Sequence, residues 1–191
     1  MNEERLWNVP NVLTMSRLPL SVLLFACISS EWWPAALLTF GVASLTDWID
    51  GWWARKFDQM SAFGRTFDPL IDKVLVAGAF IYLMPVRNAG LAPWMVTVVI
   101  GRELLITGIR GYVESLGKKF GADWFGKLKM ILQCVVLLVI LVVMSLRGQA
   151  WAEQAIGLLQ SVQMIVIYAM LAATIGSGVQ YCWKAAKLVA T

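Results

Sequence analysis

Apolar residues fall into six long runs along the chain, separated by short polar or charged breaks. A helix needs about 20 mainly apolar residues to cross the hydrocarbon of a membrane, and fewer where flanking side chains snorkel. The pattern predicts six membrane-spanning helices, at Leu13–Ser29, Pro34–Ala54, Phe67–Met84, Pro93–Leu116, Phe125–Leu146 and Ala155–Trp183. The expected fold is therefore an all-α integral membrane bundle. It forms one domain, residues 1–191, that opens with a polar segment at residues 1–12.

Composition supports a membrane protein. Hydrophobic residues make up 59% of the chain and charged residues 15%, against about 45–50% and roughly 25% in a soluble domain. No room remains for a separate soluble domain of any size. The N-terminus lacks the small-residue cleavage pattern of a secretory signal, so we expect the first apolar run to be a retained helix.

Lysine and arginine are distributed unequally between the two sets of turns. The turns on the side of the N-terminus, with the C-terminal end, hold Arg55, Lys56, Arg65, Lys118, Lys119, Lys184 and Lys187, whereas the other side holds Arg87 and Arg147. Cytoplasmic loops carry the excess of positive charge in membrane proteins, so both termini are expected to be cytoplasmic. The net charge is +4. Because the positive residues lie in loops that face an anionic leaflet and anionic substrates, this charge does not require a nucleic-acid partner.

Four aspartates lie where ionisable residues are costly, near the cytoplasmic ends of the second and third predicted helices. Asp47 and Asp50 are three residues apart and Asp68 and Asp72 four apart, so each pair shares a helical face. A short turn joins the two helices, which predicts an antiparallel hairpin whose acidic faces can meet. Ionisable residues in membrane helices are functional candidates by default.

Converging carboxylates repel one another unless some are protonated or cations balance them. The chain has no histidine, and its cysteines, Cys27, Cys134 and Cys182, lie singly in apolar runs. Oxygen ligands alone favour Mg²⁺ or Mn²⁺, and two such ions could clamp a diphosphate. The alternative is a purely structural role, in which the aspartates cap helices or pair with Arg55, Arg65 and Lys73.

Small residues accompany the aspartates. Gly51 follows Asp50, Ala54 lies one turn further on the same face, and Gly64 precedes Asp68 in the connecting turn. A missing or short side chain lets a phosphate or a ribose approach the backbone. Close helix packing in the membrane is the alternative explanation.

Together these residues resemble the signature of the CDP-alcohol phosphotransferases: Asp47-x-x-Asp50-Gly51-x-x-Ala54-Arg55, an eight-residue gap, then Gly64-x-x-x-Asp68-x-x-x-Asp72. The resemblance implies a six-helix fold, usually dimeric, with a polar cavity open to the cytoplasm. It also implies that the four aspartates bind metal, with Asp72 as the base that deprotonates the acceptor hydroxyl. Gly51, Arg55 and Ser61 would contact the CDP moiety of the donor.

Three further segments resemble the bacterial phosphatidylglycerophosphate synthase subfamily. They are Asn8 to Arg17, whose Asn11 and Thr14 would lie near the nucleotide, Gly101 to Arg110, and Trp124 to Lys129 with Gln133. The third segment departs from the subfamily, which usually has threonine where this chain has Met130. The resemblance implies transfer of a phosphatidyl group from CDP-diacylglycerol to sn-glycerol 3-phosphate, with release of CMP.

The basic residues of the fourth and fifth predicted helices agree with a phosphate-bearing acceptor. Arg102, Arg110, Lys127 and Lys129 form a cationic set near the cytoplasmic side, although positive-inside residues are the simpler explanation for some of them. Phosphatidylglycerol or inositol phosphate as acceptor remains open. From other classes, a divalent-cation transporter would place its carboxylates nearer the bilayer centre, and a non-catalytic scaffold has no use for four costly aspartates.

Overall fold

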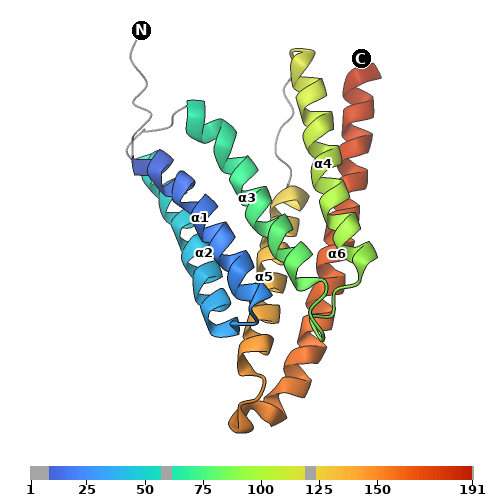
Figure 1. Cartoon of the computed structure of the whole chain (residues 1–191). Helices are drawn as coiled ribbons and strands as arrows, with labels where there is room; N and C mark the ends of the chain where they lie inside the picture. The colour runs from blue at the N-terminus through green and yellow to red at the C-terminus, as the bar shows by residue number, and fades with distance from the viewer. Residues whose placement is uncertain (1–8, 57–61, 119–123, 191) are drawn as a thin grey trace. The chain divides into compact units, whose positions relative to one another are not determined.

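The computed structural model describes residues 9–56, 62–118 and 124–190, and every regular element in these ranges is helical. The elements are α1 (Val9–Ser29), α2 (Trp33–Lys56), α3 (Ala62–Leu83), α4 (Pro93–Ser115), α5 (Trp124–Leu146), the short 3-10 helix η1 (Ala150–Ala152) and α6 (Glu153–Ala190) (Figure 1). The all-α prediction is confirmed. The helices belong to two compact units, residues 1–83 and 84–191.

Several helices extend beyond the apolar runs that predicted them. The α1 helix begins at Val9 rather than Leu13, α3 begins at Ala62 rather than Phe67, and α6 continues to Ala190. Backbone hydrogen bonds stabilise a helix whether its side chains are apolar or polar, so hydropathy alone does not mark where a helix ends. Gly64 therefore lies in the first turn of α3 and not in the connecting turn, as the sequence suggested.

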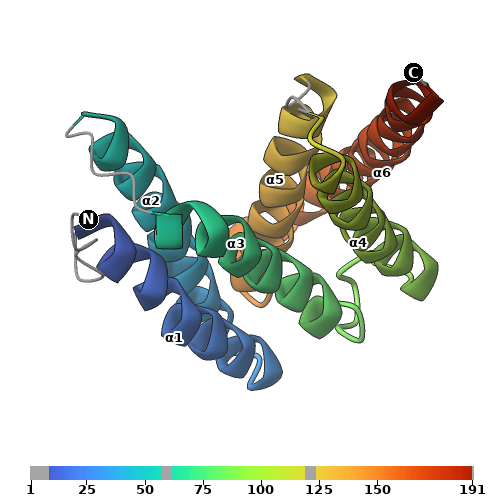
Figure 2. The same ribbon diagram turned by 90° about the horizontal axis from the view of Figure 1, so that it is seen from above.

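In the first unit, α1 packs against both α2 and α3 (Figure 2). The buried core between them includes Leu24, Ile28, Phe40 and Phe80. A tight turn joins α1 to α2, in which Glu31 adopts a left-handed φ of 55° and the Trp32 N–H donates to the Cys27 carbonyl at 2.9 Å. This hydrogen bond satisfies a carbonyl at the end of α1. The α1 helix is thus the element that both acidic helices contact.

An aromatic side chain of α1 fixes its packing on α3. The Phe25 ring stacks on Tyr82, with centroids 4.9 Å apart and planes 6° from parallel. Gly78 lies one turn before Tyr82, and a Cβ added there would come within 2.1 Å of Phe25 Cζ. The missing side chain at Gly78 is what lets the ring lie against α3.

In the second unit, α6 packs against both α4 and α5. Val136, Ile140, Ile167 and Met170 are among its buried side chains. Buried Gln163 of α6 donates through Nε2 to the Ala89 carbonyl at 2.8 Å, which attaches the segment before α4 to α6.

The other end of α4 is attached to the same helix. The Lys118 ammonium, just after α4, donates to the Leu188 carbonyl near the end of α6. Both ends of α4 are therefore held by α6.

Within the described residues, three helices are long and apolar enough to cross a membrane: α1 over Val12–Ser29, α5 over Trp124–Leu146, and α6 over Glu153–Leu188. Of the charged residues on which the site predictions rest, Lys127 and Lys129 belong to α5, and the others belong to α2, α3 and α4. Asp47 belongs to α2, Asp72 to α3, and Arg102 and Glu103 to α4.

Candidate active site

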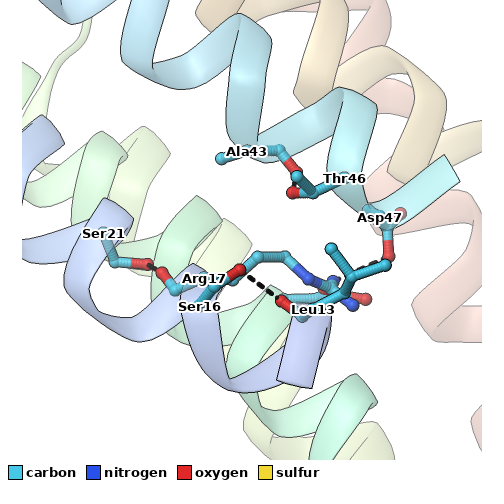
Figure 3. Close-up of polar contacts among 8 residues, drawn as sticks. Leu13, Ser16, Arg17, Ser21, Ala43, Thr46 and Asp47 are labelled. Atoms are coloured by element: carbon cyan, nitrogen blue, oxygen red, sulfur yellow. Dashed lines mark hydrogen bonds and ion pairs between the residues drawn. The ribbon is translucent and has the colours of Figure 1, made fainter. Parts of the chain in front are cut away.

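Arg17 of α1 lies at the centre of the first unit and connects its three helices. Its NH1 atom donates to Asp47 Oδ1 on α2 at 2.7 Å and also to Asp72 Oδ1 on α3. Figure 3 shows the guanidinium reaching from α1 toward Asp47. A buried charge without a partner is very costly, and these two carboxylates provide charged partners for Arg17.

Burial differs strongly across this cluster. The Arg17 side chain is 2% exposed, whereas that of Asp47 is 43% exposed and that of Asp72 is 24% exposed. The guanidinium is therefore the covered part of the cluster, and both carboxylates keep an accessible side.

The neighbouring polar groups of α1 mostly bond to their own helix. Ser16 Oγ donates to the Leu13 carbonyl and Ser21 Oγ to the Arg17 carbonyl, each at 2.7 Å (Figure 3). Such bonds let short hydroxyl side chains remain buried in a helix. Thr14, predicted to lie near the nucleotide, is 1% exposed and lies three residues before Arg17, on the same side of α1.

The two described aspartates fit a hard cation. Their Oδ1 atoms converge on a single positively charged nitrogen, which shows that carboxylates from α2 and α3 can bind one cation together. Carboxylate oxygens are the ligands that Mg²⁺ and Mn²⁺ prefer. Asp47 and Asp72 would hold such an ion through their accessible sides.

Several predicted site residues have no described side chain. Ser61 lies outside the described residues. The others lie in helices whose side chains are not described at these positions: Asn11 in α1, Asp50, Gly51, Ala54 and Arg55 in α2, and Gly64 and Asp68 in α3. Their predicted roles remain predictions.

A second polar cluster lies in the second unit, between α4 and α5. The Lys129 ammonium bonds Glu103 Oε1 and lies 3.4 Å from Gln133 Oε1, while Arg102 NH1 lies 3.5 Å from the same Glu103 oxygen. The side chains of Arg102, Glu103 and Lys129 are 9%, 14% and 7% exposed. Arg102 and Glu103, neighbours in α4, thus form an ion pair. Two buried cations share one carboxylate, which leaves a net positive charge.

Arg102 is held by packing as well as by charge. Its guanidinium carbon lies 5.4 Å from the ring centroid of Tyr181 on α6, within the range of a cation–π contact. A Cβ at Gly178 would lie 3.4 Å from Arg102 Cγ. Arg102 Nε and NH2 are buried and have no hydrogen-bond partner among the described residues. These N–H groups are donors that an anion could satisfy.

The other two cations predicted for the acceptor do not join this cluster in the described part of the chain. Lys127 is exposed at the start of α5, two residues from buried Lys129 and so on another face of the helix. Arg110 is partly buried eight residues after Arg102 on α4. The structure thus brings together Arg102 and Lys129 from the predicted set of four.

The family model for CDP-alcohol phosphatidyltransferase matches residues 7–176. The chain belongs to this family. It is 36% identical over 176 residues to the CDP-diacylglycerol--glycerol-3-phosphate 3-phosphatidyltransferase of Escherichia coli, covering 86% of this chain and 92% of the relative. The proteins of the same name from Shigella sonnei and Shigella flexneri are 36% and 35% identical over the same shares.

Sequence reasoning did not assign a role to Arg17, although it singled out the segment that contains it. The signal was available, because an arginine four residues inside an otherwise apolar spanning run needs a partner just as the aspartates do. Reasoning from neighbours in the sequence suggested Arg55, Arg65 and Lys73 as cations for the aspartates. The structure adds Arg17 of α1, which lies 30 residues from Asp47 and 55 from Asp72 in the sequence; the pairing with those three cations stays a prediction.

Proposed function

We propose that this membrane enzyme transfers the phosphatidyl group of CDP-diacylglycerol to sn-glycerol 3-phosphate, giving phosphatidylglycerophosphate and CMP. Membership of the family and the resemblance to named transferases over most of the chain support this reaction. The observation that carries the proposal is that two aspartates of the signature, Asp47 and Asp72, come together from two helices, close enough to share one nitrogen of Arg17. The proposed reaction belongs to phospholipid biosynthesis.

The acidic cluster would bind the donor. We propose that Asp47, Asp50, Asp68 and Asp72 hold two Mg²⁺ or Mn²⁺ ions, in keeping with a family that is generally dependent on divalent metals. When bound, these ions would neutralise the diphosphate and stabilise the charge that develops on the leaving CMP. Asn11, Thr14, Gly51, Ala54, Arg55, Ser61 and Gly64 would contact the CDP-lipid.

Asp72 would be the base. Its carboxylate accepts the proton of the acceptor hydroxyl as that oxygen forms a bond to the lipid-side phosphorus. The bond from this phosphorus to the CMP oxygen breaks, and CMP leaves with the electron pair. A carboxylate that is 24% exposed is accessible to a substrate hydroxyl.

The cluster of the second unit would bind the acceptor phosphate. Arg102 and Lys129 supply two buried cations, and Arg102 also has two N–H donors without a partner among the described residues, which suits a phosphate better than a neutral alcohol. Arg110 and Lys127 would add longer-range attraction. Phosphatidylglycerol, the acceptor in cardiolipin synthesis, and inositol phosphate are the alternative acceptors within the same chemistry.

We further propose six spans with both termini in the cytoplasm, a bacterial plasma membrane location with the active site on the cytoplasmic side, and a homodimer. The lysine and arginine asymmetry supports the orientation. The three apolar helices support the membrane location.

The reaction is tested by CMP release from purified protein supplied with CDP-diacylglycerol and Mg²⁺ while only the acceptor is changed. We expect turnover with glycerol 3-phosphate and little with glycerol, inositol phosphate or phosphatidylglycerol. Turnover with a different acceptor would retain the family chemistry and reject the acceptor assignment. Folded protein that releases no CMP with any of them would favour the divalent-cation transporter instead.

A further inference from the structure

Arg17 is a charged residue that the proposed reaction does not use. It is 1% exposed, and it belongs to a helix otherwise apolar enough to span a membrane. Burying an arginine in such a helix is costly, so an arginine found there generally has a function. Among the described residues, its partners include two of the four aspartates proposed as metal ligands, Asp47 and Asp72.

The geometry limits what that function can be. One nitrogen, NH1, donates to Oδ1 of both aspartates, so the two carboxylates are each held within one hydrogen bond of the same point. The Arg17 side chain is buried, whereas the side chains of both aspartates are partly exposed. A donor in this place orients the acids.

The contact also links helices. Arg17 joins α1 to both α2 and α3 through side chains, and α1 is the element against which both helices pack. The position of one acidic helix relative to the other therefore depends on the same residue that orients their carboxylates. Groups that hydrogen-bond metal-ligating carboxylates typically change metal affinity by about 10- to 100-fold when removed.

We propose that Arg17 is a positioning residue for the metal site: it holds Asp47 and Asp72 in the arrangement that binds the divalent ion. This inference rests on the proposed function of those aspartates as metal ligands. Arg17 does not touch the reacting atoms in this account, and it acts through the two carboxylates. Its loss misplaces the ligands, so the ion binds less tightly although one positive charge has been removed.

The test is a titration of the detergent-purified protein with Mn²⁺. Electron paramagnetic resonance measures the Mn²⁺ that stays unbound, and the affinity follows from it. Arg17→Met removes the donors and the charge, Arg17→Lys keeps the charge, and Ser21→Ala is the matched control. Ser21 is also 1% exposed on α1, one turn from Arg17. We expect Mn²⁺ binding to weaken roughly 10- to 100-fold in Arg17→Met, to recover in part in Arg17→Lys, and to remain at the wild-type value in Ser21→Ala.

A second readout separates positioning from general destabilisation. If Arg17 acts through the metal ligands, raising the Mn²⁺ concentration restores CMP release by Arg17→Met, whereas a damaged fold would not respond. Should Arg17→Met not fold, Arg17→Gln, which retains one donor, takes its place in both measurements. Unchanged or tighter Mn²⁺ binding in the folded variant would overturn the role of Arg17 but would leave the proposed metal site standing. Absence of Mn²⁺ binding by the wild-type protein would overturn both the inference and the proposed metal site.

Discussion

Buried charges in the two units have opposite surroundings. Arg17 is one cation between two carboxylates, and Glu103 is one carboxylate between two cations. Counting only the side chains named here, the first cluster has a net negative charge, which suits a divalent ion, and the second a net positive charge, which suits a phosphate. Removing one partner of a buried ion pair leaves the other charge without compensation, so loss of Glu103 would destabilise the second unit through the buried cations Arg102 and Lys129.

Lys129 is buried, whereas Lys127, two residues earlier in α5, is exposed. Replacing buried Lys129 by methionine removes a charged donor from the Glu103 cluster, and we expect the KM for glycerol 3-phosphate to rise roughly 10- to 100-fold. Lys127→Met, the matched control on the exposed face, should change this KM by only about twofold. The KM for CDP-diacylglycerol serves as the internal reference. Equal effects of the two variants on the acceptor KM would reject Lys129 as the phosphate ligand.

At the scale of the elements, each unit is assembled around one apolar helix, α1 in the first and α6 in the second. The more polar helices α2, α3 and α4 pack against these two. The acidic and the cationic groups are thereby carried on helices that an apolar neighbour holds in place. This arrangement explains why a partner for the aspartates comes from α1.

Packing of α1 on α3 depends on Gly78, and its replacement by alanine tests this. The new Cβ would overlap the Phe25 ring, and overpacking typically costs about 1–3 kcal/mol. Gly41→Ala is the matched control, because nothing lies within 4 Å of a Cβ added there and alanine is favoured in a helix by about 1 kcal/mol. We expect the Tm of Gly78→Ala in detergent to fall and that of Gly41→Ala to rise. A Tm for Gly78→Ala equal to or above that of Gly41→Ala would show that the ring moves without cost.

The helices and the family signature could be predicted because both are local in the sequence. Apolar runs of spanning length mark the helices, and the spacings of three and four residues place Asp47 with Asp50 and Asp68 with Asp72. The partner of Asp47 and Asp72 could not be predicted in this way, since it depends on which helix packs against α2 and α3. Likewise, four cations looked equivalent in the sequence, and only the structure separates buried Lys129 from exposed Lys127.

At the scale of the whole molecule, the proposed orientation places Arg87 outside the cell and Lys187 inside. Both are exposed, so each can be replaced by cysteine in a chain whose three native cysteines have been removed. We expect an impermeant maleimide to label Arg87→Cys in intact cells and Lys187→Cys only after permeabilisation. Labelling of Lys187→Cys in intact cells would contradict the proposal that the C-terminus is cytoplasmic.

The central claim is that this chain joins glycerol 3-phosphate to a phosphatidyl group with Asp72 as the base. The most direct measurement follows ¹³C-labelled glycerol 3-phosphate into lipid by mass spectrometry, with purified wild-type protein and with Asp72→Asn, which is nearly isosteric but cannot accept the proton. We expect labelled phosphatidylglycerophosphate from the wild type and a loss of about 10²-fold or more in the variant. Labelled lipid formed equally fast by Asp72→Asn would contradict the assignment of the base, and no labelled lipid from the folded wild type would contradict the reaction itself.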